Sequence, residues 1–455
     1  MAVVPVPEKW DYEADVIVVG AGTAGLPAAI VAAEAGAKVA ILELMSYCAS
    51  SLALINFGPA FAGTDEQKAA GIQDSPEQFY KDGVELAKGD PEFWKLFTDL
   101  HLDVYRWCKT LGMKFEAPLR GGRTHLSKGT EMLRCLERTA KEKGAEILFL
   151  HRATRLIIDP QTGRVLGLKV RVKDKEQNFK AKRAVILATG GFGQNKEMVQ
   201  EYGPEYDSCH PTMPPSHLGD GLKMAMAIGA GTTNLGSAVI SSFSIDAVAK
   251  GWGFPSGAIH VNVNGKRYTN EQDPKRFYGL ISKDGMKQPG GAYWSVYDEK
   301  ARTQPSGRTR ETGKINPQQA DTIEELAKKA GIDPKELKET IDKYNSDIKS
   351  AGYDTVFGRR PPEQPGATML TIDTPPFYAI KLMPATSSFK GGLKINTDCQ
   401  VINQYGEVIP NLYAAGEVTG GLWGAHGTYF GGTMVAASMT FGRIAGKNAA
   451  AEPSW

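Results

Sequence analysis

The chain has 455 residues, of which 42% are hydrophobic and 23% charged, so it is long enough for two domains with sizeable cores and is not disordered in composition. Its 53 basic residues nearly balance its 51 acidic residues, which excludes a net electrostatic attraction to nucleic acid or to an anionic membrane. The 5 cysteines are scattered and form no C-x-x-C pair, zinc spacing or haem attachment motif, so we expect reduced thiols, no metal site and a cytoplasmic protein. The charged N-terminus and the lack of about 20 consecutive apolar residues predict neither export nor a membrane span.

The first predicted element is a buried strand at residues 15–20 (DVIVVG), which runs into a G-x-G-x-x-G turn and a helix of small residues at 26–35. In such a turn Gly20 permits the tight bend, Gly22 lets a pyrophosphate approach the backbone, and Gly25 lets the helix pack on the strand. The diphosphate then lies at the positive end of the helix. The segment therefore predicts a dinucleotide-binding turn.

Three later strand ends complete the predicted site, and the last two of them favour FAD over NAD. A strand at 38–42 ends at Glu43, at the distance from the glycines where a carboxylate binds ribose hydroxyls. Residues 182–192 (KRAVILATGGF) and 406–421 (GEVIPNLYAAGEVTGG) are predicted to be late strands of the same sheet. A simple NAD domain does not need them, whereas the ribityl chain and isoalloxazine of a flavin run beneath such strand ends. We expect Glu417, in the second segment, to accept ribityl or ribose hydroxyls.

With these segments the chain resembles the superfamily of fumarate reductase and succinate dehydrogenase flavoproteins, which also contains the 3-ketosteroid dehydrogenases. The likeness covers nearly the whole chain. Besides the fingerprint it rests on Gly219-Asp220-Gly221 at the start of a helix, NGKRYTNE at 264–271, a helical pair at 322–350, Gly391-Gly392-Leu393, and Gly431-Gly432 before a final helix. The loop before that final helix is nearer to the ketosteroid dehydrogenases than to the dicarboxylate reductases.

The resemblance implies an α/β fold, with a Rossmann-like FAD-binding domain of the glutathione-reductase type and an inserted α+β capping domain. The FAD-binding domain is expected at 1–233 and 368–455, and the cap at 234–367. A proline-rich polar stretch, RRPPEQPGA, follows the helical pair and supports the second boundary independently. A small-molecule substrate would lie between cap and flavin, because interdomain clefts are preferred sites and closure excludes water.

The FAD site is expected to include the end of the chain. Residues 423–433 lead into a helix at 434–445, whose positive N-terminus would face the flavin N1 and C2 carbonyl. The family's Gly-Gly-Asn-Ser/Thr loop after Glu43 is Cys-Ala-Ser-Ser here, and no histidine lies at 46–58 for covalent attachment, so we expect non-covalent FAD. The predicted cofactor-binding residues are Gly20, Gly22, Ala24, Gly25, Glu43, Ser50, Ser51, Thr189, Gly190, Gly191, Gly416, Glu417, Gly432 and Thr433.

The predicted catalytic site departs from that of the dicarboxylate reductases at two positions. Fumarate reductases carry an arginine just before the Gly-Gly and a histidine in an HTMGG-like segment, and both hold a substrate carboxylate. Aligned on the glycines, this chain has Tyr429 and Ser388 instead. Because a dicarboxylate needs charge-assisted donors, fumarate is disfavoured. The ketosteroid dehydrogenases have a tyrosine at the place of Tyr429, and a phenol can donate to a neutral ketone oxygen and favour its enol.

The proton donor should follow the Asn-Glu pair that ends at Glu271 in the cap. Four residues beyond it the fumarate reductases have an arginine and the ketosteroid enzymes a tyrosine, whereas this chain has Lys275 and then Arg276. We favour Arg276, which as an acid would need Glu271 or Tyr268 beside it as a base or proton path. His125, in an R-x-H segment that the family holds near the flavin, is a further catalytic candidate.

We therefore predict hydride transfer between flavin N5 and a carbon adjacent to or conjugated with a neutral carbonyl, as in steroid-like, cyclic-ketone or polyphenol-like substrates, in either direction. One alternative is an organic-acid reductase of the fumarate or urocanate type, in which Arg276 and His426 rebuild an anion site. Another is a flavin-bearing electron-transfer subunit of a larger complex. Only one dinucleotide fingerprint is present, so the expected partners are a small-molecule substrate and an external electron donor or acceptor.

Overall fold

The computed structural model describes residues 4–54, 58–118, 122–243, 257–271, 280–303, 317–361, 368–425 and 427–455. The chain divides into two compact units. The first unit comprises Met1–Asp207, Met213–Ala238 and Ser388–Trp455, and the second comprises Ser208–Thr212 and Val239–Ser387.

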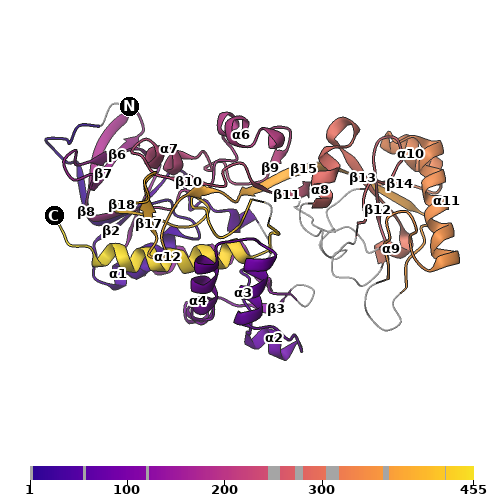
Figure 1. Cartoon of the computed structure of the whole chain (residues 1–455), viewed down its shortest axis with the longest axis horizontal. Coiled ribbons are helices and arrows are strands. Elements are labelled where there is room, and N and C mark those ends of the chain that lie inside the picture. Colours follow the sequence, from indigo (N-terminus) through magenta and orange to yellow (C-terminus); the bar gives the residue numbers. More distant parts are fainter. Residues whose placement is uncertain are drawn as a thin grey trace. The chain divides into compact units, whose positions relative to one another are not determined.

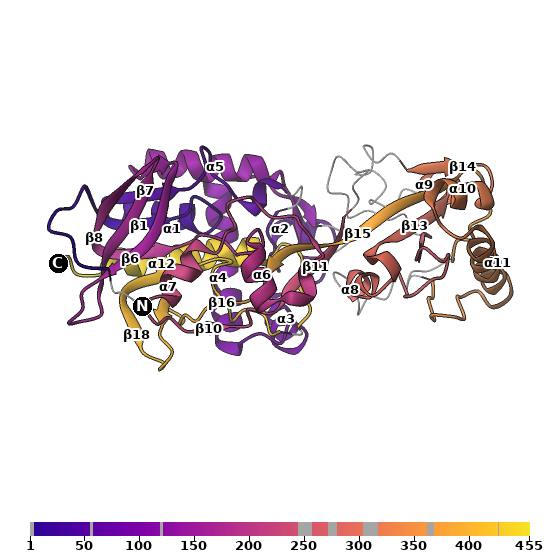
Figure 2. The same cartoon turned by 90° about the horizontal axis from the view of Figure 1, so that it is seen from above.

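An eight-stranded sheet forms the centre of the first unit (Figures 1 and 2). Five parallel strands follow in the order β18 (Val408–Ala414), β8 (Lys175–Leu187), β1 (Tyr12–Val19), β2 (Val39–Glu43) and β5 (Glu146–Phe149). Antiparallel strands complete it, with β17 (Gln400–Ile402) beside β18, and β7 (Val165–Val172) between β8 and β6 (His151–Ile158). The run VIVV in β1 and all of β2 are buried, as expected of parallel strands that are covered on both faces.

Helices cover this sheet. The helix α1 (Gly25–Glu34) packs against α12 (Thr433–Ala451) and α5 (Gly129–Glu142), and α12 also packs against α4 (Pro91–Thr110). Figure 1 shows α12 running beside α1. Two glycines of α12 permit this close approach, because a Cβ on Gly442 would lie 2.3 Å from the carbonyl oxygen of Ala24 and one on Gly446 would lie 2.2 Å from that of Ala28.

The first unit also contains shorter helices and strand pairs. They are α2 (Asp65–Ala69), α3 (Pro76–Glu85), α6 (Lys196–Tyr202), α7 (Asp220–Met226), and the strand pairs β3 (Glu116–Pro118) with β4 (His125–Leu126) and β10 (Thr232–Thr233) with β16 (Gly392–Leu393).

The second unit is built on a six-stranded sheet. The order is β11 (Ala238–Phe243), β15 (Phe377–Phe389), β13 (Tyr293–Asp298) and β12 (Ile259–Val261), while β14 (Gln318–Ala320) and β9 (His210–Pro211) also pair with β15. Its helices are α8 (Leu280–Met286), α9 (Glu299–Thr303), α10 (Ile323–Ala330) and α11 (Pro334–Ala351).

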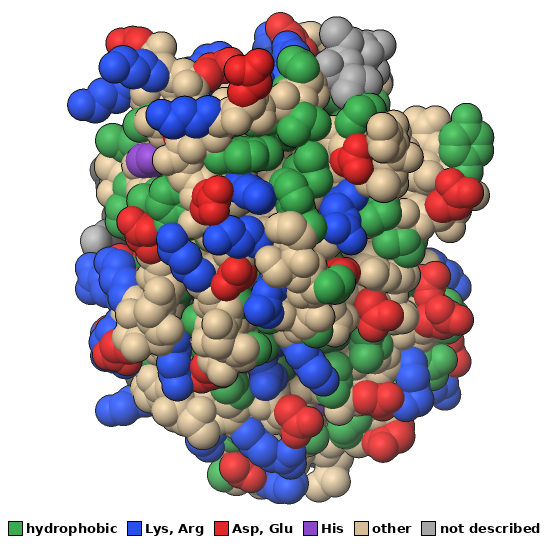
Figure 3. Space-filling view, turned by 90° about the vertical axis from the view of Figure 1, so that its left-hand side faces the viewer, with side chains coloured by type: hydrophobic (Ala, Val, Ile, Leu, Met, Phe, Trp, Pro, Cys, Tyr) green, Lys and Arg blue, Asp and Glu red, His purple; other side chains and the backbone are tan. Residues whose placement is uncertain are grey.

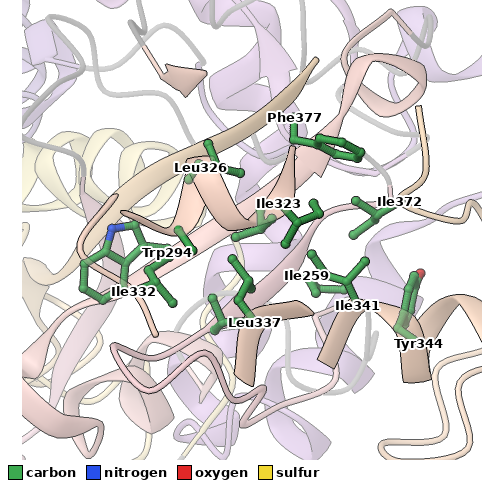
Figure 4. Packing of buried hydrophobic residues seen from close by; sticks show 14 of the residues in the cluster. Ile259, Trp294, Ile323, Leu326, Ile332, Leu337, Ile341, Tyr344, Ile372 and Phe377 are labelled. Atoms are coloured by element: carbon green, nitrogen blue, oxygen red, sulfur yellow. The ribbon is translucent and has the colours of Figure 1, made fainter. Parts of the chain in front are cut away.

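The apolar faces of α10 and α11 bury the core of the second unit against this sheet. Figure 4 shows side chains of both helices, such as Leu326 and Ile341, beside Ile259 of β12 and Phe377 of β15. Local signals set the helix ends, because Thr322 and Asp333 accept backbone hydrogen bonds from Glu325 and Glu336 at the two N-caps. The predicted helical pair at 322–350 therefore forms, broken by Gly331 in the left-handed conformation.

The second unit differs from the predicted cap, 234–367, mainly at its end. Residues 377–382 of β15 pair with β13, so the stretch after 367 contributes a strand to the second unit, and the boundary falls at Ser387. The helical pair ends at Ala351, before the proline-rich stretch, and the second unit continues beyond that stretch because β15 belongs to its sheet.

The predicted α/β fold class is confirmed, with a strand at each of the four segments that the sequence predicts to border a dinucleotide. Basic and acidic side chains are interspersed over the face of the molecule in Figure 3, in keeping with the balanced composition. Within the described residues, the helices are all too short or too polar to cross a membrane.

Candidate functional site

The carboxyl ends of four parallel strands meet at one edge of the sheet in the first unit. Val19, the last residue of β1, pairs with Leu42 and with Leu187, and Leu187 pairs with Ala414 of β18. The register therefore places the glycine turn, Glu43, the Thr-Gly-Gly segment and the Gly-Glu segment side by side. This is the edge at which open α/β sheets bind their ligands.

The glycines of the first turn have different reasons to be glycine. Gly20 has a φ of +108°, and a Cβ on it would lie 2.3 Å from the carbonyl oxygen of Ala188. A Cβ on Gly25 would lie 1.9 Å from the carbonyl oxygen of Gly20, which would separate helix and strand. A Cβ on Gly22, by contrast, would meet no atom beyond its chain neighbours closer than 3.6 Å. The fold does not need glycine at position 22, whereas a pyrophosphate approaching the backbone does.

Glu43 ends β2 with its side chain buried. Its carboxylate accepts hydrogen bonds from the backbone N–H groups of Ala21 at 3.0 Å and Met45 at 2.9 Å, which fix its orientation beside the glycine turn. Burial raises the pKa of Glu43 despite these donors. A carboxylate oxygen has a second lone pair, so Glu43 retains acceptor capacity for ribose hydroxyls.

Three of the predicted cofactor-binding residues present hydroxyls that the described protein leaves without a partner. The buried atoms are Ser51 Oγ, Thr189 Oγ1 and Thr433 Oγ1. Ser50 differs, because its Oγ lies 2.8 Å from Thr23 Oγ1 and accepts from the N–H of Leu52. Since buried polar groups of native proteins are almost always hydrogen-bonded, the three orphaned hydroxyls mark a place for a polar ligand. The residues present fit FAD, whose phosphates and hydroxyls would supply the missing partners.

A histidine that the sequence analysis did not single out, His217, lies between the segment that follows β8 and the segment that follows β18. Glu417 is buried, and its Oε1 accepts from the N–H of Phe389 at 3.1 Å. The Nδ1 of His217 lies 3.5 Å from Glu417 Oε2. A Cβ on Gly191 would lie 2.4 Å from Glu417 Oε1, so the glycine makes room for the carboxyl group. The sequence signal that could have found His217 is its place two residues before the Gly-Asp-Gly motif.

The N-terminus of α12 is formed as the FAD prediction requires. Gly432 is its N-cap, with a φ of +78°, and a Cβ there would lie 2.7 Å from the carbonyl oxygen of Gly58. No side chain caps this end of the helix, which is 19 residues long. Its positive first turn, beginning at Thr433, is therefore not neutralised by a capping side chain of the chain itself.

The loop that carries Tyr429 is held from several sides within the first unit. Lys390 donates from Nζ to the carbonyl oxygen of Gly427 at 2.7 Å, Asn234 donates to that of Trp423 at 3.0 Å, and the Ser237 hydroxyl donates to Ala425 at 2.5 Å. The half-buried Tyr429 ring lies against Trp423, with centroids 5.5 Å apart. Such support restricts where the phenol can point, as a substrate-binding group requires.

Ser388 lies at the end of β15 with 7% of its surface exposed. The next residue, Phe389, packs on Phe192 with ring centroids 4.2 Å apart. Because side chains alternate along a strand, Ser388 projects to the side opposite Phe389. Lys390, the first residue after β15, is also buried, and the catalytic role of Ser388 stays a prediction.

His125 has both ring nitrogens engaged within the first unit. Nδ1 donates to the carbonyl oxygen of Arg123 at 2.8 Å, and Nε2 lies 2.8 Å from the hydroxyl of Thr64. Arg123 in turn binds Asp74 through two hydrogen bonds and also pairs with Asp82. Burial lowers the pKa of His125, so its neutral form is favoured. These contacts account for His125 structurally, and its catalytic role stays a prediction.

The proposed proton donors Lys275 and Arg276 lie outside the described residues, as does His426. Glu271, which precedes the two donors, has a buried side chain in the second unit and accepts two hydrogen bonds of 2.9 and 2.8 Å from Arg267. Arg359 also reaches it at 3.2 Å. Burial alone would raise the pKa of Glu271, but the two arginines outweigh burial and lower it. Glu271 is thus committed to ion pairs, while the nearby Tyr268 hydroxyl is buried without a partner among the described residues.

Comparison with known proteins places these features in a family. The model of the family described as FAD binding domain matches residues 15–434. A flavocytochrome c3 fumarate reductase in its open conformation is 31% identical, with a TM-score of 0.83, over 97% of this chain and 78% of that one. The 3-ketosteroid-Δ4-(5α)-dehydrogenase from Rhodococcus jostii RHA1 is 26% identical, with a TM-score of 0.78, over 98% of each chain. The vinyl phenol reductase of Lactiplantibacillus plantarum is 28% identical over 96% of each protein.

Proposed function

The chain belongs to the family of the FAD binding domain, and from this premise we propose that it transfers a hydride between FAD and a carbon conjugated with a neutral carbonyl or phenolic oxygen. The predictions of FAD as cofactor and of an oxidoreductase that acts on CH–CH or C=C bonds are confirmed, as is the superfamily of fumarate reductase and succinate dehydrogenase flavoproteins. The type of substrate is the proposal.

The observation that carries the proposal is Tyr429 in its supported loop. When bound, FAD supplies the hydride chemistry, and the chain must hold the substrate oxygen and move a proton. With a conjugated carbonyl compound, Tyr429 would donate a hydrogen bond from its phenol to the carbonyl oxygen, which carries increasing negative charge as the hydride arrives at the double bond. Lys390 holds Gly427, two residues before Tyr429, so it would fix the position of the donor. Arg276 or Lys275 remains the proposed source of the proton.

Two relatives support a neutral substrate. The Rhodococcus enzyme forms a complex with 4-androstene-3,17-dione, a neutral compound whose double bond is conjugated with a ketone. The Lactiplantibacillus relative is named for a vinyl phenol, in which the double bond is conjugated through a ring with a phenolic oxygen. In each compound one oxygen is conjugated with the double bond and there is no carboxylate, which matches one phenolic donor better than a pair of cationic anchors.

A second candidate function is the reduction of an unsaturated organic acid. The fumarate reductase shares more of its residues with this chain than the ketosteroid dehydrogenase does, at 31% against 26%. Lys390 also provides a buried basic side chain two residues after Ser388. A monocarboxylate could use that single charge, so the two candidates must be separated by experiment.

Anaerobic reoxidation of the reduced flavin separates them. The reduced protein is mixed in turn with 4-vinylphenol, a 3-ketosteroid enone, cyclohexenone, an isoflavone, acrylate, urocanate and fumarate, and the flavin absorbance is followed. We expect rapid reoxidation by at least one of the neutral compounds while the acids remain inert. Rapid reoxidation by an acid, with all neutral compounds inert, would overturn the proposal and favour the organic-acid reductase.

A further inference from the structure

His217 and Glu417 form a buried pair that the family fingerprint does not explain. The side chains of His217 and Glu417 are each 8% exposed. Backbone contacts hold the histidine in place, because its carbonyl oxygen accepts from the N–H of Gln194 at 3.1 Å and the following Gly219 donates to Gly191 at 3.1 Å. The segment before α7 is thereby fastened to the turn after β8.

Both side chains press against that turn. A Cβ on Gly190 would lie 2.5 Å from His217 Nε2, and one on Gly191 would lie 2.4 Å from Glu417 Oε1. Neither glycine could be replaced without moving the pair. The same turn begins with Thr189, whose buried hydroxyl has no partner among the described residues. The pair therefore lies beside the Thr189 hydroxyl, which lacks a hydrogen-bond partner among the described residues.

The hydrogen bonding of the pair is incomplete without a ligand. Glu417 Oε1 accepts one hydrogen bond, from the N–H of Phe389, and has a second lone pair. His217 Nδ1 is buried, lies 3.5 Å from Glu417 Oε2, and has no hydrogen-bond partner within the described chain. A small shift of either side chain would make a normal hydrogen bond of this contact. A proton held between the two groups would account for the approach of this ring nitrogen to the carboxyl group.

Burial of the pair favours a neutral acid hydrogen-bonded to a neutral imidazole. Burial raises the pKa of Glu417 to about 8 and lowers that of His217 to about 4. On the neighbouring elements, Asp220 is paired with Arg152 and Lys390 binds the Gly427 carbonyl. In this state the Glu417 hydroxyl donates to His217 Nδ1, and Oε1 is the carbonyl oxygen that remains to accept from a ligand.

We propose that His217 is a positioning residue for the cofactor, which holds Glu417 by a hydrogen bond so that Glu417 Oε1 accepts from a hydroxyl of the ribityl or ribose part of FAD. The inference rests on the FAD site of the first unit and is independent of the substrate assigned above. It gives the segment before the Gly-Asp-Gly motif a role in binding the cofactor. The pair works as a protonated unit, in contrast to Glu43, which is held by backbone donors alone.

The test measures the affinity of the FAD-free protein for FAD by quenching of flavin fluorescence at pH 7. Glu417→Gln carries the test, because an amide keeps the carbonyl oxygen and the donor to His217. We expect its FAD dissociation constant to stay within about threefold of wild type, and that of Glu417→Ala to rise by about tenfold or more, the size of one hydrogen bond. A tenfold loss in Glu417→Gln would overturn the proposal, because it would show that a carboxylate is required.

Variants of His217 provide the second part of the test. His217→Ala should weaken FAD binding by about tenfold, whereas His217→Asn, which keeps an acceptor near the place of Nδ1, should recover most of it. The double variant with Glu417→Ala should bind no more weakly than Glu417→Ala alone, since both remove one interaction. Unchanged affinity in His217→Ala, or additive losses in the double variant, would overturn the proposal. Each result is read from FAD affinity alone, so it stands whether or not the reduced flavin reacts with neutral substrates.

Discussion

Two buried glutamates, one in each unit, occupy opposite environments. Glu271 in the second unit is surrounded by Arg267, Arg359 and the N–H of His260, and its pKa is lowered. Glu417 in the first unit has one backbone donor and a histidine at 3.5 Å, and its pKa is raised to about 8. The protein compensates the charge of Glu271 with two arginines. Among the described residues, no arginine or lysine does the same for Glu417.

This difference distinguishes a structural group from a ligand-binding one. A buried ion pair is strongly destabilised when one member is removed, because the other charge remains buried. A buried acid with spare acceptor capacity costs stability until a ligand supplies the missing hydrogen bond. We therefore expect substitutions near Glu271 to affect folding, and substitutions near Glu417 and its turn to affect cofactor binding.

The largest expected effect is on the stability of the second unit. Glu271→Gln would leave Arg267 and Arg359 with one carboxylate fewer, and we expect a loss of about 3–5 kcal/mol in the free energy of unfolding, measured with urea. Asp342→Asn serves as control, because its pair with Lys338 is exposed and should be worth at most about 0.5 kcal/mol. A loss below about 1 kcal/mol in Glu271→Gln would contradict the structural role.

The next effect concerns catalysis in the first unit. Tyr429→Phe removes the hydroxyl but keeps the ring that packs on Trp423, and we expect kcat to fall by about a hundredfold to a thousandfold with FAD content unchanged. Tyr405→Phe, at an 88% exposed position of the same unit, should have wild-type activity. Unaltered turnover in Tyr429→Phe would remove this residue from the proposed mechanism.

A smaller effect compares two glycines of one turn. Gly22→Ala has room for its methyl group within the protein, so the FAD-free form should unfold at the wild-type temperature. The methyl group would obstruct the pyrophosphate and weaken FAD binding by roughly 1–3 kcal/mol, or about 5- to 150-fold. Gly25→Ala should behave in the opposite way and lose stability first, because its Cβ meets Gly20. Equal effects of both variants on stability would refute the distinction.

The smallest effect is the pH dependence of Glu417. Its pKa is about 8 in the folded chain against 4.5 for an ordinary glutamate, so the folded state retains a proton that the unfolded state has lost, and stability falls as the pH rises through this window. His217 acts in the opposite sense, but only below 6.5. Between pH 6.5 and 8 the FAD-free wild type should therefore lose on the order of 1 kcal/mol relative to Glu417→Gln. Parallel stability curves for the two proteins would show that Glu417 is already ionised.

Much of the fold could be read from local patterns. The run DVIVVG and the glycines after it predict a strand, a turn and a helix, because a buried parallel strand is continuously apolar and only glycine tolerates the bend at Gly20. Residues 322–350 likewise carry their own caps. The end of the second unit could not be predicted in this way, because the place of β15 depends on its pairing with β13, about 80 residues earlier in the chain.

The sequence by itself determined which segments border the cofactor edge, since each ends a strand at residues suited to phosphates and hydroxyls. Only the tertiary structure decided what each side chain does there. It left the Thr189 hydroxyl without a partner among the described residues, satisfied Ser50 and His125 within the protein, placed His217 beside Glu417, and tied Lys390 to the loop of Tyr429. The physical reason is that these hydrogen bonds join residues far apart in the chain, whose distances are set by strand register and helix packing and not by spacing along the sequence.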